Sequence, residues 1–249
     1  MISLGISKTG LVRQRNEDRF YAQGPLLIVA DGMGGYTGGE YASTMVVDAI
    51  VNVVEKSKEV SAHVLRNALL EANHMVYRKS QSYKELEGMG TTAVVAYVQK
   101  NILYWAHVGD SRLYIFNNKI ESITQITEDH SFVMHLFKEG KINFSEMKKH
   151  PRRNEITRAV GIKPELVVDK GHLTFDINSV MLLCSDGLTS MVTDQSINNC
   201  MKKHKIIKKF NLKACMNELI DMTYKAGAED NVSVILACDE SLENGVNYE

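Results

Sequence analysis

The sequence predicts an α+β protein in which antiparallel sheets are covered by pairs of helices. Short polar connections at Gln99-Lys100-Asn101 and Asn117-Asn118-Lys119 join successive strand-like segments, which favours antiparallel hairpins over parallel crossovers. Two amphipathic helical stretches follow the first three strands without an intervening strand, and two more precede the last strand. Consecutive helices of this kind indicate a helical layer over a sheet.

The N-terminal third predicts three strands followed by two helices. The strands cover residues 2–7, 19–22 and 26–31. The first helix opens at Gly38 and carries apolar residues at helical spacing from Ala42 to Val53. Ser61 is the expected N-cap of the second helix, because an apolar face at helical spacing starts three residues later.

The rest of the chain predicts further strands around one irregular stretch. The strands are expected at residues 91–98, 102–108, 112–116, 120–126, 166–175, 179–185 and 232–238, and the helices at 194–204 and 211–226. Residues 127–161 show little sustained periodicity, and a long irregular insert in a compact domain is usually functional or disordered. We therefore expect one domain over residues 1–240 and a polar tail over 241–249.

The composition is that of an ordinary soluble globular protein, with 44% hydrophobic and 24% charged residues in 249. The net charge of -1 indicates no broad attraction to nucleic acid or to an anionic membrane. No apolar run approaches the ~20 residues of a membrane span, and the first residues lack the pattern of a signal peptide. We expect a cytoplasmic monomer that binds neither nucleic acid nor membrane.

Four cysteines occur outside any Cys-x-x-Cys spacing, at Cys184, Cys200, Cys215 and Cys238. We therefore expect buried thiols rather than a zinc or redox site. A cysteine-dependent phosphatase needs an arginine six positions after its cysteine. The residues at those positions are Ser190, Ile206, Asp221 and Asn244. That chemistry is therefore excluded.

The stretch from Asp31 to Gly35 follows an apolar strand and is too rich in glycine for an ordinary turn. Its glycines permit positive φ and a close approach of the backbone to a ligand. Asp31 and the carbonyl groups after it offer hard oxygen ligands, which suit Mg²⁺ or Mn²⁺. A nucleotide-binding P-loop is rejected, because Glu40 and Tyr41 replace the lysine and the hydroxyl residue that it requires.

Asp31 is one of four aspartates that stand at strand edges beside Gly or Asn, together with Asp110, Asp186 and Asp230. One strand that ends in Asp-Gly is more often a simple turn. Four such carboxylates at one rim would repel one another unless cations neutralised them. The sequence therefore predicts a site for several metal ions, and two ions about 3.5–4 Å apart commonly serve phosphate-ester hydrolysis.

Seven short motifs occur in order along residues 1–238: Arg13-x-x-Asn16-Glu17-Asp18, Asp31-Gly32-Met33-Gly34-Gly35, Gly90-Thr91-Thr92, Val108-Gly109-Asp110-Ser111-Arg112, Asp129-His130-Ser131, Ser185-Asp186-Gly187-Leu188 and Asp230-Asn231-Val232. With these motifs the chain resembles the metal-dependent protein phosphatases, the type-2C serine/threonine phosphatases, and their bacterial branch in particular. The resemblance implies a four-layer α-β-β-α sandwich, in which two antiparallel sheets are flanked by helix pairs. That fold agrees with the predicted order of strands and helices.

The resemblance also implies the ligands of two Mn²⁺ or Mg²⁺ ions. Asp31 would bridge both ions. Asp186 and Asp230 would complete the protein ligands of one ion, and Glu17 and the carbonyl of Gly32 would bind the other.

Three further roles and one segment follow from the same resemblance. Asp18 would orient the attacking water, and Arg13 would hold the substrate phosphate with bidentate hydrogen bonds. Asp110 and Asp186 match positions that hold a third ion in bacterial relatives. Residues 131–160 match the flap beside the active site of the family.

One departure from the animal members of the family stands at Met33, where they carry a histidine thought to act as the general acid. Because bacterial relatives usually have Met here, the departure indicates the branch. It leaves the proton donor to the leaving group unassigned. We expect His130, His150 and His172 to be structural or surface residues.

The resemblance implies a phosphoserine/phosphothreonine phosphatase that uses a metal-activated water. Its partners would be phosphorylated proteins, including a cognate bacterial Ser/Thr kinase and the substrates of that kinase. A catalytically weak phosphoprotein-binding module is the alternative, although such proteins usually lose metal ligands that this chain retains. A hydrolase of small phosphate esters is a third hypothesis and would need a closed pocket.

Overall fold

The computed structural model describes residues 1–34, 37–205 and 209–239. Its strands are β1 (Ile2–Lys8), β2 (Arg19–Gln23), β3 (Leu26–Ala30), β4 (Gly32–Met33), β5 (Gly90–Thr91), β6 (Ala93–Gln99), β7 (Ile102–Val108), β8 (Arg112–Asn117), β9 (Ser122–Gln125), β10 (Asp169–Thr174), β11 (Ser179–Cys184) and β12 (Val232–Cys238). Its helices are α1 (Gly38–Lys56), α2 (Ala62–Ser82), α3 (Phe132–Lys138), α4 (Phe144–Met147), α5 (Asp186–Thr189), α6 (Asp194–His204) and α7 (Lys209–Lys225), with a 3-10 turn at Lys84–Leu86.

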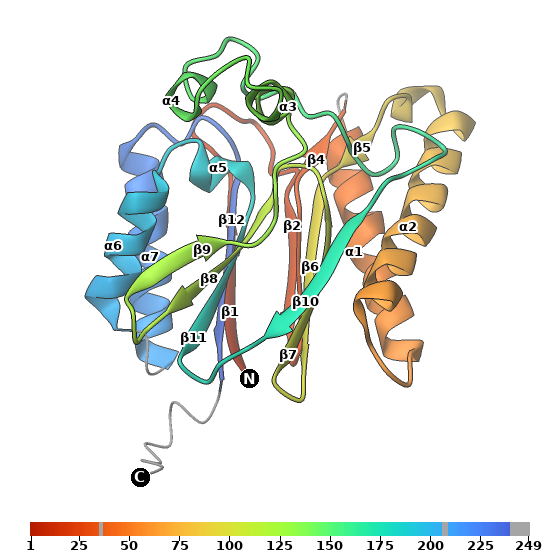
Figure 1. Cartoon of the computed structure of the whole chain (residues 1–249). Coiled ribbons are helices and arrows are strands. Elements are labelled where there is room, and N and C mark those ends of the chain that lie inside the picture. Colours follow the sequence, from red (N-terminus) through yellow and green to blue (C-terminus); the bar gives the residue numbers. More distant parts are fainter. Residues whose placement is uncertain (35–36, 206–208, 240–249) are drawn as a thin grey trace.

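Two five-stranded antiparallel sheets lie face to face in the centre of the molecule (Figure 1). One sheet has the strand order β1-β12-β11-β8-β9, and the other has the order β10-β7-β6-β3-β2. Helices α6 and α7 cover the outer face of the first sheet, and α1 and α2 cover that of the second. The predicted α+β class and the four-layer α-β-β-α sandwich are therefore confirmed.

Three hydrophobic clusters follow from the two-residue period of the central strands. In β3, Leu26 and Ile28 belong to the cluster beneath α1 and α2, whereas Leu27 and Val29 belong to the cluster between the sheets. Strands β11 and β12 alternate in the same way against α6 and α7. Because both faces of these strands are covered, their sequences read as continuous apolar runs rather than alternating ones.

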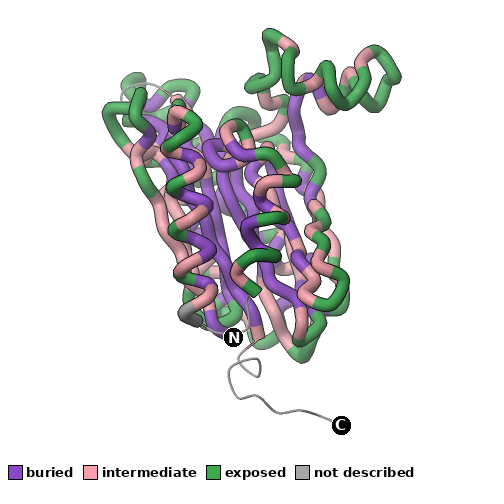
Figure 2. The backbone as a smooth tube through the Cα atoms, turned by 90° about the vertical axis from the view of Figure 1, so that its left-hand side faces the viewer, coloured by how far each residue is buried: buried purple, intermediate pink, exposed green. Residues whose placement is uncertain are grey.

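The stretch expected to be irregular, residues 127–161, contains two short helices. The Ser131 side chain caps α3 by accepting from the Met134 N–H, and Asn143 forms a capping box with Glu146 at the start of α4. Most side chains of this segment are exposed, and it projects from the body at the top of Figure 2. We call residues 131–160 the flap.

Other boundaries differ from the predictions where polar groups interrupt a strand. The strand expected at 91–98 is divided at Thr92, whose backbone turns to bond Asp31. The strand expected at 166–175 begins at Asp169, and Asp186 starts α5 instead of ending a strand. The N-cap at Ser61 is confirmed, because its side chain accepts from the Val64 N–H.

Two sequence predictions fall on residues outside the described ranges. They concern the last glycine of the motif that begins at Asp31, which is Gly35, and the polar tail over 241–249. Within the described ranges, every helix is too short or too polar to span a membrane.

Candidate metal and phosphate site

The four predicted strand-edge aspartates lie together at the rim of the sandwich that carries β4 and α5 (Figure 1). Burial raises the pKa of Asp31 well above its ordinary value, and the negative charges of Asp18, Asp186, Asp110 and Asp230 raise it further. A carboxyl group responds in this way only to other carboxylates that are close to it. The rim therefore gathers five acids from distant parts of the chain.

Two threonines fix the backbone of Asp31 at the end of β3. The Asp31 N–H donates to Thr92 Oγ1 at 3.1 Å, and the Asp31 carbonyl accepts from Thr92 N at 2.8 Å and from Thr91 Oγ1 at 2.7 Å. Thr92 Oγ1 also bonds Ser111 Oγ at 2.7 Å, beside Asp110. These hydroxyl groups connect the backbone of Asp31 to Ser111, the residue that follows Asp110. Sequence reasoning assigned them no role, although Thr91 and Thr92 stand in one motif and Ser111 in another.

Glu17 reaches the rim because two glycines let the chain approach closely. A Cβ on Gly32 would lie 2.1 Å from the Gly39 carbonyl oxygen and 2.6 Å from that of Glu17. A Cβ on Gly39 would lie 2.8 Å from the Glu17 carboxylate. Neither position can accept a side chain without movement of the backbone. Glu17 and the backbone of Gly32 are thus neighbours, as the predicted ligand set requires.

Asp18 is buried, with 1% of its surface exposed, and it is held on one side only. Its Oδ2 accepts from Ser185 Oγ at 2.8 Å, and Ser185 Oγ in turn accepts from the Ser233 N–H at 3.0 Å. Burial raises the pKa of Asp18 to about 7, although hydroxyl hydrogen bonds lower it. Ser185 therefore positions Asp18, a role that its place directly before Asp186 could have suggested.

Arg13 is half exposed and donates to Asp230 Oδ2 at 2.6 Å. This hydrogen bond raises the pKa of Arg13, and the charges of Asp31 and Glu17 act in the same direction. Asn231 fixes the neighbouring loop, because its Nδ2 donates to the Arg15 carbonyl at 2.9 Å. The guanidinium thus lies against the acids and can reach an anion bound there.

The side chains at this rim suit divalent cations. Asp18 Oδ1 and Asp186 Oδ1 are buried and have no hydrogen-bond partner among the described residues. Burial is also the first cause that raises the pKa of Asp110 and Asp186, and neighbouring carboxylates add to it. Buried anionic oxygens without donors lack compensation, and hard cations such as Mn²⁺ or Mg²⁺ supply it. The donor set therefore fits the predicted ions.

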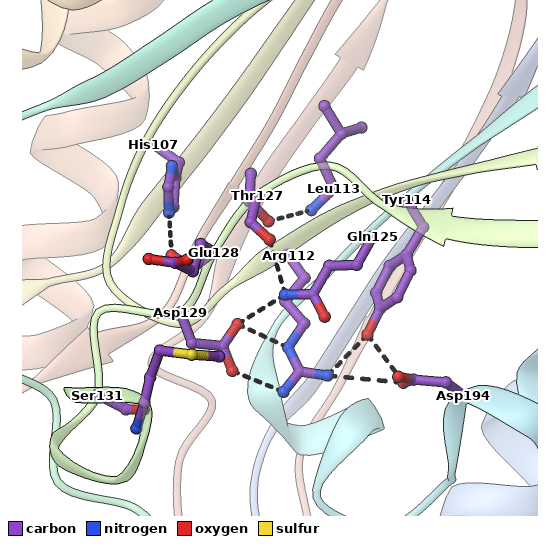
Figure 3. A network of polar contacts seen from close by, with 11 residues as sticks. His107, Arg112, Leu113, Tyr114, Gln125, Thr127, Glu128, Asp129, Ser131 and Asp194 are labelled. Carbon is purple, nitrogen blue, oxygen red and sulfur yellow. Dashed lines mark hydrogen bonds and ion pairs between the residues drawn. The ribbon is translucent and has the colours of Figure 1, made fainter. Parts of the chain in front are cut away.

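A network of paired charges is built around Arg112 (Figure 3), and the charges of Arg112 and Asp129 both act on the pKa of Asp110. Arg112 donates to both carboxylate oxygens of Asp129, at 2.8 and 2.6 Å, and to the Tyr114 hydroxyl at 2.7 Å. Gln125 also donates to Asp129, at 2.9 Å, and the Tyr114 hydroxyl donates to Asp194 at 3.0 Å. The network ties β8 to the base of the flap and to the start of α6.

His130 is held through both of its ring nitrogens. Its Nδ1 accepts from the Gly109 N–H at 3.1 Å, and its Nε2 lies 3.2 Å from Asp169 Oδ2. Its ring stacks on that of His107, with centroids 4.4 Å apart. Gly109 has a φ of 104°, which favours glycine, so this histidine fixes a turn before Asp110 that requires glycine.

The two other candidate histidines lie away from the acids. His150 packs its ring near Phe132 in the flap, with centroids 5.8 Å apart. His172 is exposed on β10, the edge strand of its sheet. Met33, in β4, pairs with Gly90 of β5. None of these placements supplies a side-chain proton donor beside the aspartates.

An open cleft of about 510 Å³ runs along the acids. Arg13, Asp186 and Asp230 line one side of it, and Arg153 and Asn154 of the flap line the other. Both flap residues are exposed, so the flap side of the cleft faces solvent. An extended segment of another protein could therefore reach the carboxylates.

Comparisons with known proteins agree with this geometry. A family model described as Protein phosphatase 2C matches residues 11–134. The serine/threonine phosphatase stp of Listeria welshimeri is 34% identical over 247 residues, which cover 95% of this chain and 95% of that protein. The crystal structure of Stp1 from Staphylococcus aureus superposes with a TM-score of 0.87 at 34% identity, covering 96% of this chain and 94% of that one.

A further similar structure was solved with metal ions. It is the catalytic domain of the serine/threonine protein phosphatase PstP in complex with 2 manganese ions, with a TM-score of 0.83 and 32% identity. The alignment covers 94% of this chain and 96% of that one. The fold and the gathered carboxylates thus define a protein of the metal-dependent phosphatase class. This chain belongs to the protein phosphatase 2C family, and its similar relatives are bacterial.

Proposed function

We propose that this chain is a metal-dependent protein phosphatase that hydrolyses phosphoserine and phosphothreonine in other proteins. The observation that carries the proposal is the gathering of five carboxylates, two of them with unpartnered buried oxygens, beside an open cleft that Arg13 reaches. Family membership supports the reaction class. One catalytic domain over residues 1–240 would contain the whole site.

Two Mn²⁺ or Mg²⁺ ions would be held by the acids of the rim. Asp31 would bridge the ions, since its charge interacts with the other aspartates. Asp186 and Asp230 would complete one ligand set, and Glu17 and the Gly32 carbonyl would complete the other. The close packing of Glu17 against the glycines supports this second set. When bound, the ions activate a water molecule and neutralise the phosphate.

The remaining side chains would position the water and the substrate. Asp18, fixed through Oδ2 by Ser185, has Oδ1 available to accept a hydrogen bond from the attacking water. Arg13 would bind two phosphate oxygens with its planar fork of donors. Asp110, with Asp186, would hold a third ion, and burial together with the charge of Asp186 supports that role.

The cleft distinguishes this function from the other hypotheses. A site for small phosphate esters would enclose its ligand, whereas the flap side of this cleft is exposed. A catalytically weak phosphoprotein-binding module would be expected to lack ligands. Glu17, Asp31, Asp186 and Asp230 are all present and gathered. The exposed cleft and the complete set of proposed ligands both favour an active protein phosphatase.

The partners would be phosphorylated proteins in the cytoplasm, including a cognate Ser/Thr kinase and its substrates. The enzyme would act as a monomer. The irregular, polar surface of the flap beside the cleft supports contact with a protein substrate.

Metal depletion and one substitution test the proposal. A chelator should abolish release of phosphate from a phosphothreonine peptide, and Mn²⁺ should restore it. Asp31→Ala should lower kcat by roughly 10³-fold or more, about 4 kcal/mol in activation free energy, because both ions lose a ligand. Asp221→Ala, an exposed aspartate on α7, is the matched control. Full activity of folded Asp31→Ala would refute the assignment.

A further inference from the structure

A cluster of cysteine, histidine and glutamate side chains lies between α6 and α7, on the outer layer of the sandwich. Cys200, His204 and Glu218 each offer one ligand atom, and these three atoms all lie within 4.8 Å of one another. The thiol of Cys215 lies 3.7 Å from that of Cys200. The four residues come from adjacent turns of two facing helices, because Cys200 and His204 are four apart and Cys215 and Glu218 are three apart.

We propose that Cys200, His204, Cys215 and Glu218 form a binding site for one Zn²⁺ ion, separate from the carboxylate rim. Two thiolates, one imidazole and one carboxylate are the ligand types of a four-coordinate zinc site. Two sulfurs bound about 2.3 Å from one tetrahedral ion lie roughly 3.7–3.8 Å apart. The observed separation of the two thiols, 3.7 Å, already has that value.

The burial of the four side chains supports the site. Cys200 and Cys215 are 3% and 0% exposed, whereas the His204 and Glu218 side chains are 17% and 31% exposed. The thiols thus form the inner half of the cluster, and the imidazole and carboxylate form an outer half that an ion can reach from solvent. His204 Nε2 and Glu218 Oε2 lie 2.7 Å apart, so both groups are turned to the same point.

The ion would replace contacts that cost little to break. Lys203 bonds both oxygens of Glu218 at 2.9 and 2.8 Å, but its side chain is 65% exposed. Exposed ion pairs of this kind contribute little stability. On binding, the two thiols would release their protons to solvent and the zinc ion would balance the thiolate charges.

The sequence argued against a zinc site because no Cys-x-x-Cys pair occurs. The prediction of buried thiols is confirmed for all four cysteines. The pairing of Cys200 with Cys215 depends on how α6 packs against α7, which local spacing does not encode. The cluster lies toward the end of α6 that is remote from Asp194 and the rim, so it can fill independently of the catalytic ions.

Cobalt substitution tests the site with a signal that carboxylates do not produce. Reduced, metal-free protein titrated with Co²⁺ should develop thiolate-to-cobalt charge-transfer absorption with the intensity of one thiolate-bound ion per chain, whatever further Co²⁺ the carboxylate rim binds, and Zn²⁺ should displace it. The Cys200→Ala/Cys215→Ala double variant should lose this absorption. Cys238→Ala removes another fully buried thiol and should keep it. His204→Gln and Glu218→Gln should each weaken binding more than about tenfold.

Two outcomes would overturn the site. The first is absence of the charge-transfer absorption in the unsubstituted chain, or its persistence in the double variant. The second is recovery of Cys200 and Cys215 as a disulfide in metal-free protein, which would identify a redox pair instead. Asp31→Ala should retain the absorption, so failure of the proposed phosphatase chemistry and failure of the zinc site give different results.

Discussion

Two groups of carboxylates lie next to each other at the rim of the sandwich, and their surroundings differ. In the first group, Asp18 and Asp186 each have one buried carboxylate oxygen without a partner among the described residues. In the second group, Asp129 receives two hydrogen bonds from Arg112 and one from Gln125. The first group thus has anionic oxygens that no donor in the described ranges compensates, whereas the second is a completed ion-pair network.

The paired carboxylates contribute to folding stability, whereas the unpaired ones are suited to chemistry at a cost in stability. Buried anions without partners reduce the stability of the metal-free protein, because burial and mutual repulsion oppose their ionisation. Paired carboxylates hold the turn before β8 and the base of the flap in place. The network therefore builds the support on which the unpaired acids can bind ions.

Among the variants that compare the two groups, Asp18→Asn should have the largest effect on activity. The substitution keeps the shape of the side chain and removes its charge. We expect kcat on a phosphopeptide to fall by roughly 10²–10³-fold, about 3–4 kcal/mol in activation free energy. The free energy of unfolding in chelator should rise, because one buried charge is gone.

Steady-state kinetics in saturating Mn²⁺ and urea unfolding in chelator measure these two quantities. Asp221→Asn, which changes an exposed aspartate on α7, controls for the loss of one charge. If Asp18→Asn instead destabilised the metal-free protein, Asp18 would belong with the paired carboxylates and the distinction between the groups would fail.

Asp129→Asn makes the same chemical change in the paired network and should have the opposite effect on stability. Arg112 would lose the nearer of its two carboxylate partners and keep Asp194, 3.6 Å from Nη1, while it remains largely buried, so the free energy of unfolding should fall by about 3 kcal/mol. The loss should appear with and without Mn²⁺. Because Asp129 is not among the proposed metal ligands, kcat of the folded enzyme should fall less than in Asp18→Asn.

A double variant sharpens this test. Arg112→Met combined with Asp129→Leu removes both charges and replaces them with apolar side chains, which often restores stability. Recovery of most of the lost unfolding free energy would show that the cost lies in the unpaired arginine. A loss equal to that of the single variant would show that the network acts through other contacts, such as Tyr114.

The clustering of the first group could be predicted from local sequence, whereas the pairing of Asp129 with Arg112 in the second group could not, although both residues stand in motifs. Asp31, Asp110, Asp186 and Asp230 each follow an apolar strand or precede one, and glycine or asparagine beside them provides a local signal. Asp129 has no such signal, because its partner Arg112 is set by the register of β8 against β9 and the chain that follows.

The fold shows the same division between local and non-local information. The period of the strands and the cap at Ser61 predict elements that the structure confirms. The bounds of the short helices α3 and α4 could not be predicted beyond a short helical pattern after Ser131, because one or two turns carry no periodic apolar face and depend on caps at Ser131 and Asn143. The contact of Ser185 with Asp18 joins residues 167 positions apart.

His107, another buried titratable side chain with an atom that lacks a partner in the described part of the chain, should make the stability of the fold depend on pH. Its Nε2 bonds the Glu128 carbonyl at 2.9 Å, so Nε2 carries the proton and the buried Nδ1 has no partner among the described residues. Burial, with the nearby His130, lowers the pKa of His107 to about 4, although Asp169 and Asp129 act against this. Protonation of Nδ1 would leave a buried donor without an acceptor.

The sign of the effect follows from this lowered pKa. Between about pH 6.5 and 4, the unfolded chain binds a proton at this histidine and the folded chain does not, so stability falls as the pH falls. From pH 6.5 to 5 the contribution is about 2 kcal/mol. Urea unfolding of the original chain and His107→Gln across this range should show a smaller pH dependence in the variant. Equal slopes would show that His107 is protonated in the folded state.

Arg13→Ala should have the smallest effect, since Arg13 is half exposed and its ion pair with Asp230 contributes little stability. The loss of the guanidinium should raise KM for a phosphopeptide by roughly tenfold, because two hydrogen bonds to the ground-state phosphate are removed, and kcat should change less. Arg13→Lys keeps the charge without the planar fork, so its KM should lie between those of the original chain and Arg13→Ala.

The measurement that decides the role of Arg13 is the division of the effect between KM and kcat. A large fall in kcat at unchanged KM would show that Arg13 acts on the transition state, and unchanged kinetics would remove it from the site. The affinity for Mn²⁺ tests whether Arg13 also orders the first group of carboxylates. Because Arg13 occupies an oxygen of Asp230 in the metal-free protein, Arg13→Ala should bind Mn²⁺ at least as tightly as the original chain. Weaker binding would mean that Arg13 orders the first group of carboxylates, as Arg112 orders the second.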